Sequence, residues 1–567
     1  MIGKNALVTR RTRLKEILAL GRRPQQVLIL SVITGALTGA AVALFDWIVS
    51  DVLFDRVLRQ SDWFKAIVPM IGLILAALAL KFLAGGATPS TSDEYIRNFH
   101  DRHRRLDERP VLGRIAASIA TLGLGGAMGY EGPSIYMGAA IGSAIQRRMS
   151  RFFSRDDAKA LLVAGAAAGV AAIFKAPATG VVFALEVPFQ DDVARRMLLP
   201  ALVAAAVSYV VFVSFNGTTP LLPVNGAPPF DLRDLGGAAL LGLMCGVGAR
   251  GFAVMLTYAK KTAARVNPVI RIAVAGVALV GLYAASKAIA NEGLTLGPGY
   301  RTVAWALDPR HGLGLVVGIF FLRALATTAT VAGGGAGGLF VPLVIQGVLI
   351  GRAVGGLFGA PDSSLFPVIG IAAFLGAGYR VPLAAVVFVA ETTGRPGFVV
   401  PGLIAAAVAQ LAMGRSSVSP YQVAARAGHL ERRFSLPISA ALQADVMTMP
   451  PDTTVREFFA LHLIGNRQKS VPVVDDNHRY VGMARLDELD SVEESDWETT
   501  AVSAIARSDL PVARPDWRLR EAIEAMQAAD VDRLPVVDSG GRFIGVVSTS
   551  EILKLDEILG EADSLGG

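Results

Sequence analysis

Long apolar runs alternate with short polar segments as far as about residue 414, and the rest of the chain is polar. The runs expected to form helices are 26–50, 64–84, 111–128, 134–147, 158–173, 193–214, 236–258, 269–290, 312–331, 340–357, 366–378, 381–392 and 399–413. A helix rises about 1.5 Å per residue and a bilayer core is about 30 Å thick, so the longer runs are sufficient to cross a membrane. The shorter runs fit half-spans, which occur where irregular backbone lines a buried site. The pattern therefore predicts an α-helical polytopic membrane protein with a soluble tail.

Composition and charge agree with a membrane protein. Hydrophobic residues make up 53% of the 567 residues, and 60 residues are glycine, which is far from the average of soluble domains. The net charge is +7, and residues 1–24 form a basic arm before the first apolar run. A basic flank of this kind is typical of a cytoplasmic N-terminus, so we do not expect a nucleic-acid partner. The single cysteine, Cys245, excludes an intrachain disulfide.

One acidic residue, Glu131, lies inside the glycine-rich apolar segment GGAMGYEGPSIYMGAAIGSAI. Proline suits the first turn of a helix, so Gly132 and Pro133 are expected to open one. The first N–H groups of a helix have no internal partner, and they attract anions. The segment therefore indicates an anion-binding helix start with a carboxylate beside it, although glycines also serve simple close packing of helices.

The same pattern returns later in the chain, in GGAGGLFVPLVIQGVLIGRAV. Gly129 and Pro133 correspond there to Gly338 and Pro342. The segments that follow also match, since APATGVVFALE corresponds to VPLAAVVFVAE. This is an internal duplication. In membrane proteins, duplicated and glycine-interrupted helices are typical of two repeats that meet at a site near the midplane.

The segments GYEGP and GGLFVP and the later Tyr421 resemble the signature elements of the CLC family of chloride channels and chloride/proton exchangers. The resemblance covers about residues 25–430. It implies two inverted repeats, at about 25–215 and 236–414, and a homodimer with one pore per subunit. It also implies a transporter of chloride or a similar anion in the plasma membrane, and not an enzyme.

By this resemblance, Glu131 is the gate of the anion pathway. The anion would be bound by backbone N–H groups at Gly132, Phe340 and Val341 and by the hydroxyl of Tyr421. A carboxylate at the same helix ends can occupy an anion position and block it until it is protonated or displaced. Helix ends suit turnover because they offer only about half a positive charge.

The chain departs from the family where a serine normally contacts the central anion. Gly86 or Ala87 aligns with that serine, so the hydroxyl is missing and the anion preference is open. Thr88 or Ser90 is a candidate substitute, and both also fit ordinary turn and cap positions. We therefore include Gly86, Ala87 and Thr88 among the candidate anion-binding residues.

Two further departures concern protons and charge. Val187 stands where many exchangers of the family carry the acid that loads protons from the cytoplasm. The absence of this acid weakens the expectation of coupled exchange, so channel-like and proton-coupled transport both remain open. Tyr130 replaces the arginine that usually stands beside the gate, which removes a positive charge near the outer mouth.

The tail contains a second repeat, which resembles a tandem pair of CBS modules with an α/β fold. We expect a linker at 431–440, modules at 441–500 and 501–560, and a short end at 561–567, all in the cytoplasm. SVPVVDD with YVGMA recurs as RLPVVDS with FIGVVS. Such pairs often bind adenine nucleotides. Ser548 and Glu551 are the candidate ribose ligands in the second module, with Arg485 and Glu488 in the first, and a purely structural clamp is the alternative.

Two other functions were weighed. One is a family member that prefers nitrate or another anion. The other is a magnesium transporter with CBS modules, which would need clustered carboxylates. Glu131, Glu186 and Glu391 stand in separate motifs, so we expect no metal site and no required cofactor.

Overall fold

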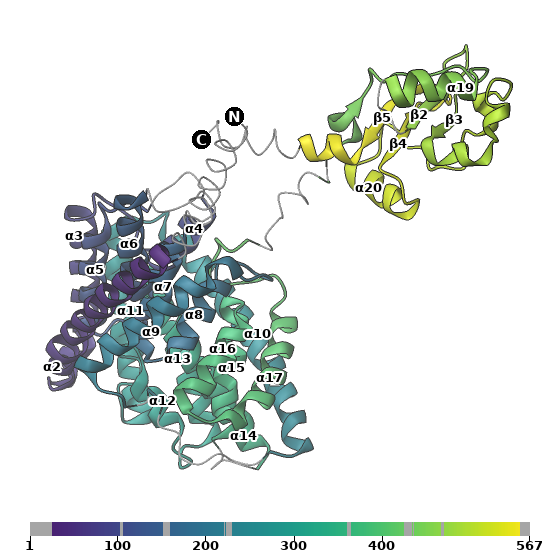
Figure 1. Cartoon of the computed structure of the whole chain (residues 1–567). Coiled ribbons are helices and arrows are strands. Elements are labelled where there is room, and N and C mark those ends of the chain that lie inside the picture. Colours follow the sequence, from purple (N-terminus) through teal and green to yellow (C-terminus); the bar gives the residue numbers. More distant parts are fainter. Residues whose placement is uncertain are drawn as a thin grey trace. The chain divides into compact units, whose positions relative to one another are not determined.

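The computed structural model describes residues 25–555 apart from 102–105, 151–158, 220, 223–229, 360–363, 424–433, 435 and 466–469. The chain forms two compact units, Met1–Ala425 and Arg426–Gly567. Helices make up the first unit, and the second combines helices with small sheets (Figure 1).

The first unit begins with the helix Gln25–Leu58, which is π-helical over Trp47–Phe54. The helices after it are α3 (Asp62–Phe82), α4 (Ser92–His100), α5 (Val111–Gly123), α6 (Glu131–Arg148), α7 (Ala160–Phe174), α8 (Pro177–Glu186), α9 (Leu198–Asn216), α10 (Leu232–Ala263), α11 (Pro268–Ala290), α12 (Tyr300–Ala306), α13 (Leu313–Ala332), α14 (Phe340–Leu357), α15 (Leu365–Tyr379), α16 (Pro382–Thr393) and α17 (Val399–Met413).

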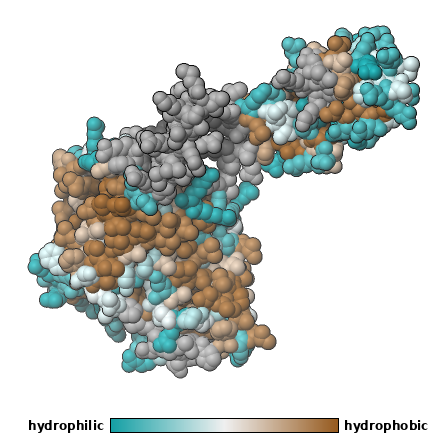
Figure 2. Space-filling view, in the orientation of Figure 1, coloured by the Kyte–Doolittle hydropathy of each residue, from teal (hydrophilic) through white to brown (hydrophobic). Residues whose placement is uncertain are grey.

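Eight helices of the described chain are long and apolar enough to cross a membrane. The shorter apolar helices are α5, α7, α8, α15 and α16, so the expectation of unequal spans is confirmed. Figure 2 shows hydrophobic side chains over much of the visible face of this unit. Lipid-facing residues need no polar partner, which explains why large apolar side chains stay exposed on these helices.

The two repeats meet through reciprocal hydrogen bonds. The Thr330 hydroxyl accepts a bond from the Ala127 N–H at 3.2 Å, and the equivalent Thr121 hydroxyl accepts one from the Ala336 N–H at 3.1 Å. Each bond joins one repeat to the other, so the duplication seen in the sequence is also a pairing in space. The fold is that of a membrane protein built from two inverted repeats, as predicted.

Helices α7 and α15 are equivalent in the two repeats, and every residue of both is buried. Both are rich in alanine and glycine, which lets neighbouring helices approach closely. Each ends in a residue with left-handed backbone, Lys175 after α7 and Arg380 after α15. These two helices form the interior on which the functional site is built.

One element was not foreseen. The polar segment between the second and third expected spans contains α4, whose buried residues are Tyr95, Ile96 and Asn98. A short amphipathic helix of this kind lacks the long apolar run on which the sequence prediction relied. The helix matters because its first turn reaches the site.

The second unit contains two small sheets. Strand β5 (Phe543–Ser548) lies between β1 (Leu442–Gln443) and β4 (Arg533–Val537), and β2 (Ser470–Val474) pairs with β3 (Tyr480–Arg485). All these pairs are antiparallel. Helix α20 (Leu519–Ala528) packs on β4, and its partner in the first module begins with α19 (Val455–Glu457). The tail therefore has the α/β character that was predicted.

Candidate functional site

The starts of α6 and α14 meet at a short antiparallel bridge between Gly129 and Gly338. The Gly129 N–H donates to the Gly338 carbonyl at 2.9 Å, and the Gly338 N–H donates to the Gly129 carbonyl at 2.8 Å. These are equivalent residues of the two repeats. The bridge therefore brings two helix N-termini, whose first N–H groups have no partner within their own helix, to one place in the interior.

Glu131 lies at this junction and is fully buried. Its Oε1 accepts a hydrogen bond of 2.5 Å from the N–H of Phe340, the first residue of α14. Its Oε2 has no hydrogen-bond partner within the described ranges. A side chain at Gly129 or Gly338 would collide with the carboxylate. Because both residues are glycines, the Glu131 carboxylate has room to lie at the start of α14, the equivalent helix of the other repeat.

The other predicted backbone donors lie at the same junction. Gly132 is the second residue of α6, and Phe340 and Val341 open α14. All three are buried, so their N–H groups are shielded from water. The structure thus brings the predicted gate and the predicted backbone donors together.

The predicted serine substitute lies elsewhere. Gly86 is exposed in a turn with φ of +81°, and the Thr88 carbonyl and hydroxyl face the guanidinium of Arg114. Thr91 approaches the site instead. Its Oγ1 lies beside Gly132 and donates to the Gly337 carbonyl at 3.2 Å. The reason is the turn before α4, which places Gly86, Ala87 and Thr88 ahead of the helix start while Thr91 reaches inward as its N-cap.

The structure places Tyr421, the predicted hydroxyl donor, away from the junction and places another tyrosine, Tyr379, close to it. Tyr421 is 42% exposed, and its ring faces the guanidinium of Arg97. Tyr379, at the end of α15, is only 1% exposed, and its hydroxyl lies close to Ser92 and to the backbone of Leu339. Leu339 directly precedes Phe340, so the structure places the Tyr379 hydroxyl close to the Glu131 junction.

A signal for Tyr379 was present in the sequence. The segments FKAP and YRVP correspond in the two repeats, so Phe174 and Tyr379 are equivalent. Both rings belong to an aromatic cluster around Phe340, with centroids 4.4 Å apart for Phe174 and Phe340 and 5.6 Å apart for Phe183 and Tyr379. Phenylalanine at the equivalent position shows that the ring alone is enough for packing. The additional hydroxyl of the tyrosine therefore indicates a polar role.

Val187 is buried, and its carbonyl accepts a bond of 2.9 Å from the Gln422 side chain. The neighbouring Glu186 does not replace the missing acid. Its two oxygens accept bonds from the N–H groups of Leu383 and Ala384, at 3.2 and 2.8 Å, and so bind the first turn of α16.

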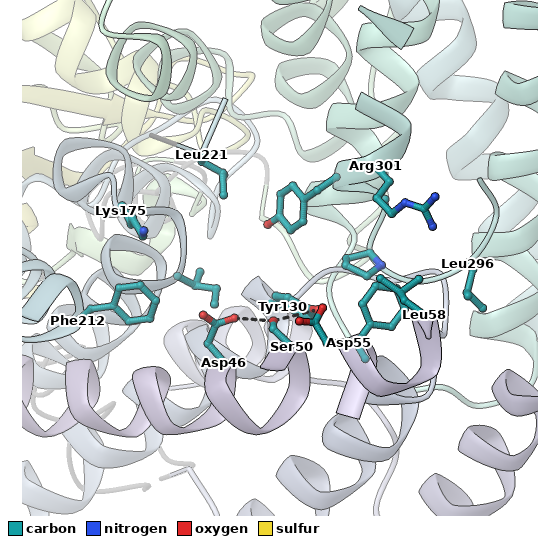
Figure 3. A pocket seen from close by; sticks show the side chains of 15 residues that line it. Asp46, Ser50, Asp55, Leu58, Tyr130, Lys175, Phe212, Leu221, Leu296 and Arg301 are labelled. Atoms are coloured by element: carbon teal, nitrogen blue, oxygen red, sulfur yellow. Dashed lines mark hydrogen bonds between the residues drawn. The ribbon is translucent and has the colours of Figure 1, made fainter. Parts of the chain in front are cut away.

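A cavity of about 290 Å³ lies beside the junction, on the side of Tyr130 (Figure 3). Ser50 donates to Asp46 Oδ1 at 2.9 Å and lies 3.3 Å from the Tyr130 hydroxyl, so a chain of three polar groups runs along one wall. Lys175 and Arg301 also line the cavity. Asp46 and Asp55 line it as well, so the cavity carries charges of both signs.

The candidate ribose residues of the tail have local partners. The Ser548 hydroxyl accepts a bond of 3.3 Å from the Glu551 N–H and contacts Ser550 at 2.9 Å. Glu551 pairs with Lys554 at 2.6 Å. In the first module, Arg485 pairs with Asp487 at 3.0 Å, and Glu488 lies 3.9 Å from Arg507.

Arg507 and Asp509 form an ion pair in the tail. The Arg507 guanidinium hydrogen-bonds to Asp509 and holds the pKa of that carboxyl below its ordinary value. Among the described residues, no group of three or more histidine, cysteine, aspartate or glutamate side chains is placed to hold a metal ion.

Comparison with known families gives two matches. The model described as voltage gated chloride channel matches residues 71–414. The CBS domain model matches residues 438–492 and 502–557.

Similar proteins agree with these families. An H(+)/Cl(-) exchange transporter ClcA of Salmonella paratyphi A is 26% identical over 415 residues, which are 70% of this chain and 87% of that protein. A ClcA of Cronobacter sakazakii is 27% identical over 414 residues, which are 69% and 87% of the two chains. Among solved structures, a CLC-type fluoride/proton antiporter has a TM-score of 0.59 at 23% identity, over 70% of this chain and 98% of its own. A slow cyanobacterial Cl-/H+ antiporter has a TM-score of 0.59 at 20% identity, over 68% and 94%.

Proposed function

We propose that this chain, which belongs to the voltage-gated chloride channel family, moves chloride or a similar small anion across a membrane in exchange for protons. Glu131 is the gate in this proposal. Exchange is favoured over a channel because the ClcA relatives are named as H(+)/Cl(-) exchange transporters. The plasma membrane is the proposed location, with the tail on the cytoplasmic side and two chains forming a dimer.

One observation carries the proposal. The carboxylate of Glu131 is fully buried and accepts the first N–H of α14. That N–H, with those of Gly132 and Val341, is the kind of donor that a dehydrated anion needs, because helix starts attract negative charge without a mobile counter-ion. The carboxylate therefore occupies an anion position and excludes a free anion from it.

Protonation explains how the gate opens. A neutral carboxylic acid accepts a weaker hydrogen bond from a helix start than a carboxylate does, because the charge-assisted part of the bond is lost. A protonated Glu131 side chain then yields its position to chloride. Since the same group carries the proton and blocks the anion, movements of the two ions are linked.

The bound anion would have two hydroxyls beside the backbone donors. Thr91 lies next to Gly132, and Tyr379 lies next to Leu339. We assign them the roles first considered for Thr88 and Tyr421. Which anion is preferred depends on this pair, and a preference for nitrate or fluoride over chloride would follow from its spacing and not from Glu131.

The tail is proposed as a regulatory pair of CBS modules, with an adenine nucleotide as the candidate ligand. The match to two CBS domains supports this role. Ser548 and Glu551 remain the proposed contacts to the ribose. Their local bonds fit equally the alternative of a structural clamp.

The test is transport by the full-length protein in proteoliposomes. Chloride efflux is followed with a silver chloride electrode and proton uptake with a pH electrode in the same sample. We expect an outward chloride gradient to drive protons inward against their own gradient. Absence of chloride movement would refute the proposed function, and chloride movement without protons would reduce it to a channel.

A further inference from the structure

Proton exchange requires a path that brings protons to Glu131 from the solution on the side from which the tail leaves, and this inference rests on the proposed exchange. Glu131 is fully buried and cannot meet bulk water directly. Val187 cannot carry a proton. A side chain that loads Glu131 from this side therefore has to come from another position.

The segment 188–190 lies on this side of the unit. The Pro188 carbonyl accepts a bond of 3.2 Å from the Val423 N–H, and the Gln190 N–H donates to the Val423 carbonyl at 2.9 Å. Val423 is the last described residue before the chain leaves for the second unit. The segment around Pro188 therefore lies next to the point at which the chain leaves the first unit.

The carboxylates nearby are engaged by other groups. Glu186 binds the first turn of α16, as described above. The remaining pairs are Asp93 with Lys260 at 3.6 Å, Glu94 with Arg97 at 2.9 Å and Asp191 with Arg380 at 2.7 Å. An ion-paired carboxylate is stabilised in its charged form, so it is a poor carrier of protons near neutral pH.

His100 differs from these groups. It is the last residue of α4, it is half-buried, and its Nε2 lies 2.6 Å from the Pro188 carbonyl. Its ring packs edge-on against Phe99 and Phe189, with centroids 5.1 and 5.2 Å away. These contacts fix the imidazole directly beside the backbone of residue 188, next to Val187.

The bond to Pro188 also fixes the tautomer. A carbonyl only accepts, so Nε2 must carry the hydrogen, and Nδ1 is left with the lone pair. Nδ1 takes up a proton to give the imidazolium, and loss of the same proton to water or to an acceptor restores the neutral ring. The charged residues close to this histidine in the chain are Arg97 and Asp101, and Asp191 and Asp192 follow Pro188 on the opposing segment. Histidine is the side chain whose ordinary charge change falls between pH 5 and 8.

A connected set of contacts leads from this point towards Glu131. The Gln422 side chain donates to the carbonyls of Val187 and Tyr379, at 2.9 and 2.6 Å. The Tyr379 hydroxyl lies close to Leu339, which precedes the Phe340 N–H that binds Glu131. These contacts form a series of neighbouring residues between the His100 position and the gate.

We propose that His100 loads protons from the tail side for delivery to Glu131, in place of the acid that is absent at Val187. Water has to carry the proton over the remaining distance. The role is that of a proton-transfer residue at the entry of the pathway, and the anion itself does not contact it.

The test compares four full-length proteins in the liposome assay described above. His100→Gln keeps the size and a hydrogen-bond donor but cannot titrate, so we expect proton movement to fall roughly 100-fold with chloride movement kept. His311→Gln is the matched control, because His311 stacks on Trp305 of α12, and α12 lies at the other end of the unit from α4 (Figure 1). It should behave as wild type. In His100→Gln/Val187→Glu, the new carboxylate should restore proton movement.

The outcomes are distinguishable. Proton movement that persists in His100→Gln would overturn the inference. Wild-type protein that moves chloride without protons would also overturn the inference, but it would leave the proposal of anion transport standing. Wild-type protein that moves neither ion would refute the proposed function itself. Chloride movement in His100→Gln shows that the variant has folded, so its loss of proton movement would support the inference.

Discussion

Glu186 and Glu391 each bind the first turn of the helix that carries the other. Glu186, at the end of α8, accepts from the N–H groups of Leu383 and Ala384 on α16. Glu391, near the end of α16, accepts from the N–H groups of Ala178 and Thr179 on α8, at 3.0 and 2.8 Å. Because the two helices are equivalent in the two repeats, the pair ties the repeats together through matched contacts.

This relationship predicts matched losses of stability. Glu186→Ala and Glu391→Ala should each lower the free energy of unfolding by about 1–3 kcal/mol, because each leaves helix N–H groups without partners. Thermal unfolding of the detergent-solubilised protein measures the effect. Glu292→Ala is the control, since it removes only a surface pair with Arg301 and should change little. Destabilisation by only one of the two substitutions would contradict the equivalence.

The gate predicts a change in pH dependence. Protonation of Glu131 removes the negative charge that competes with the anion, so wild-type chloride flux should rise as the pH falls. Glu131→Gln mimics the protonated form and cannot titrate, and its flux should be high and independent of pH. Flux across a series of symmetric pH values measures this. A variant that keeps the wild-type profile would show that Glu131 is not the gate.

The two tyrosines predict opposite results from the same substitution. Tyr379→Phe removes a buried hydroxyl near the helix starts, and it should weaken the apparent affinity for chloride by about 0.5–1.5 kcal/mol, the net scale of one hydrogen bond. Tyr421→Phe removes an exposed hydroxyl and should leave the affinity unchanged. Calorimetric titration with chloride compares the two variants. The reverse order of effects would return the role to Tyr421.

The tail predicts separable effects on stability and on ligand binding. Ser548→Ala removes the hydroxyl that caps the turn at Glu551 and should cost about 0.5–2 kcal/mol of stability. Glu551→Ala should weaken nucleotide binding by at most about 3 kcal/mol, the scale of a charge-assisted hydrogen bond. Calorimetry with ATP, ADP and AMP on the full-length protein decides the second point. Heat from none of the three would favour the structural clamp.

Spacing along the chain was enough to predict the membrane unit, the duplication and the tail repeat, and the resemblance to a known family added the gate. The thickness of the bilayer sets the length of each apolar helix, and this length can be counted directly in the sequence. The match of Gly129 to Gly338 and the single acid between glycines likewise needed no coordinates. The structure then places Glu131, Gly132, Phe340 and Val341 at one junction, where the sequence prediction had grouped them.

Only the tertiary structure decided which side chains reach that junction from elsewhere. Thr91, directly before α4, and Tyr379, at the end of α15, lie close to it, whereas the sequence prediction named Thr88 and Tyr421. The physical reason is that the position of a hydroxyl depends on the turn next to its helix and on the packing around its side chain. Such placement depends on contacts between residues far apart in the chain, for example Thr91 with Gly337, and no local pattern records them.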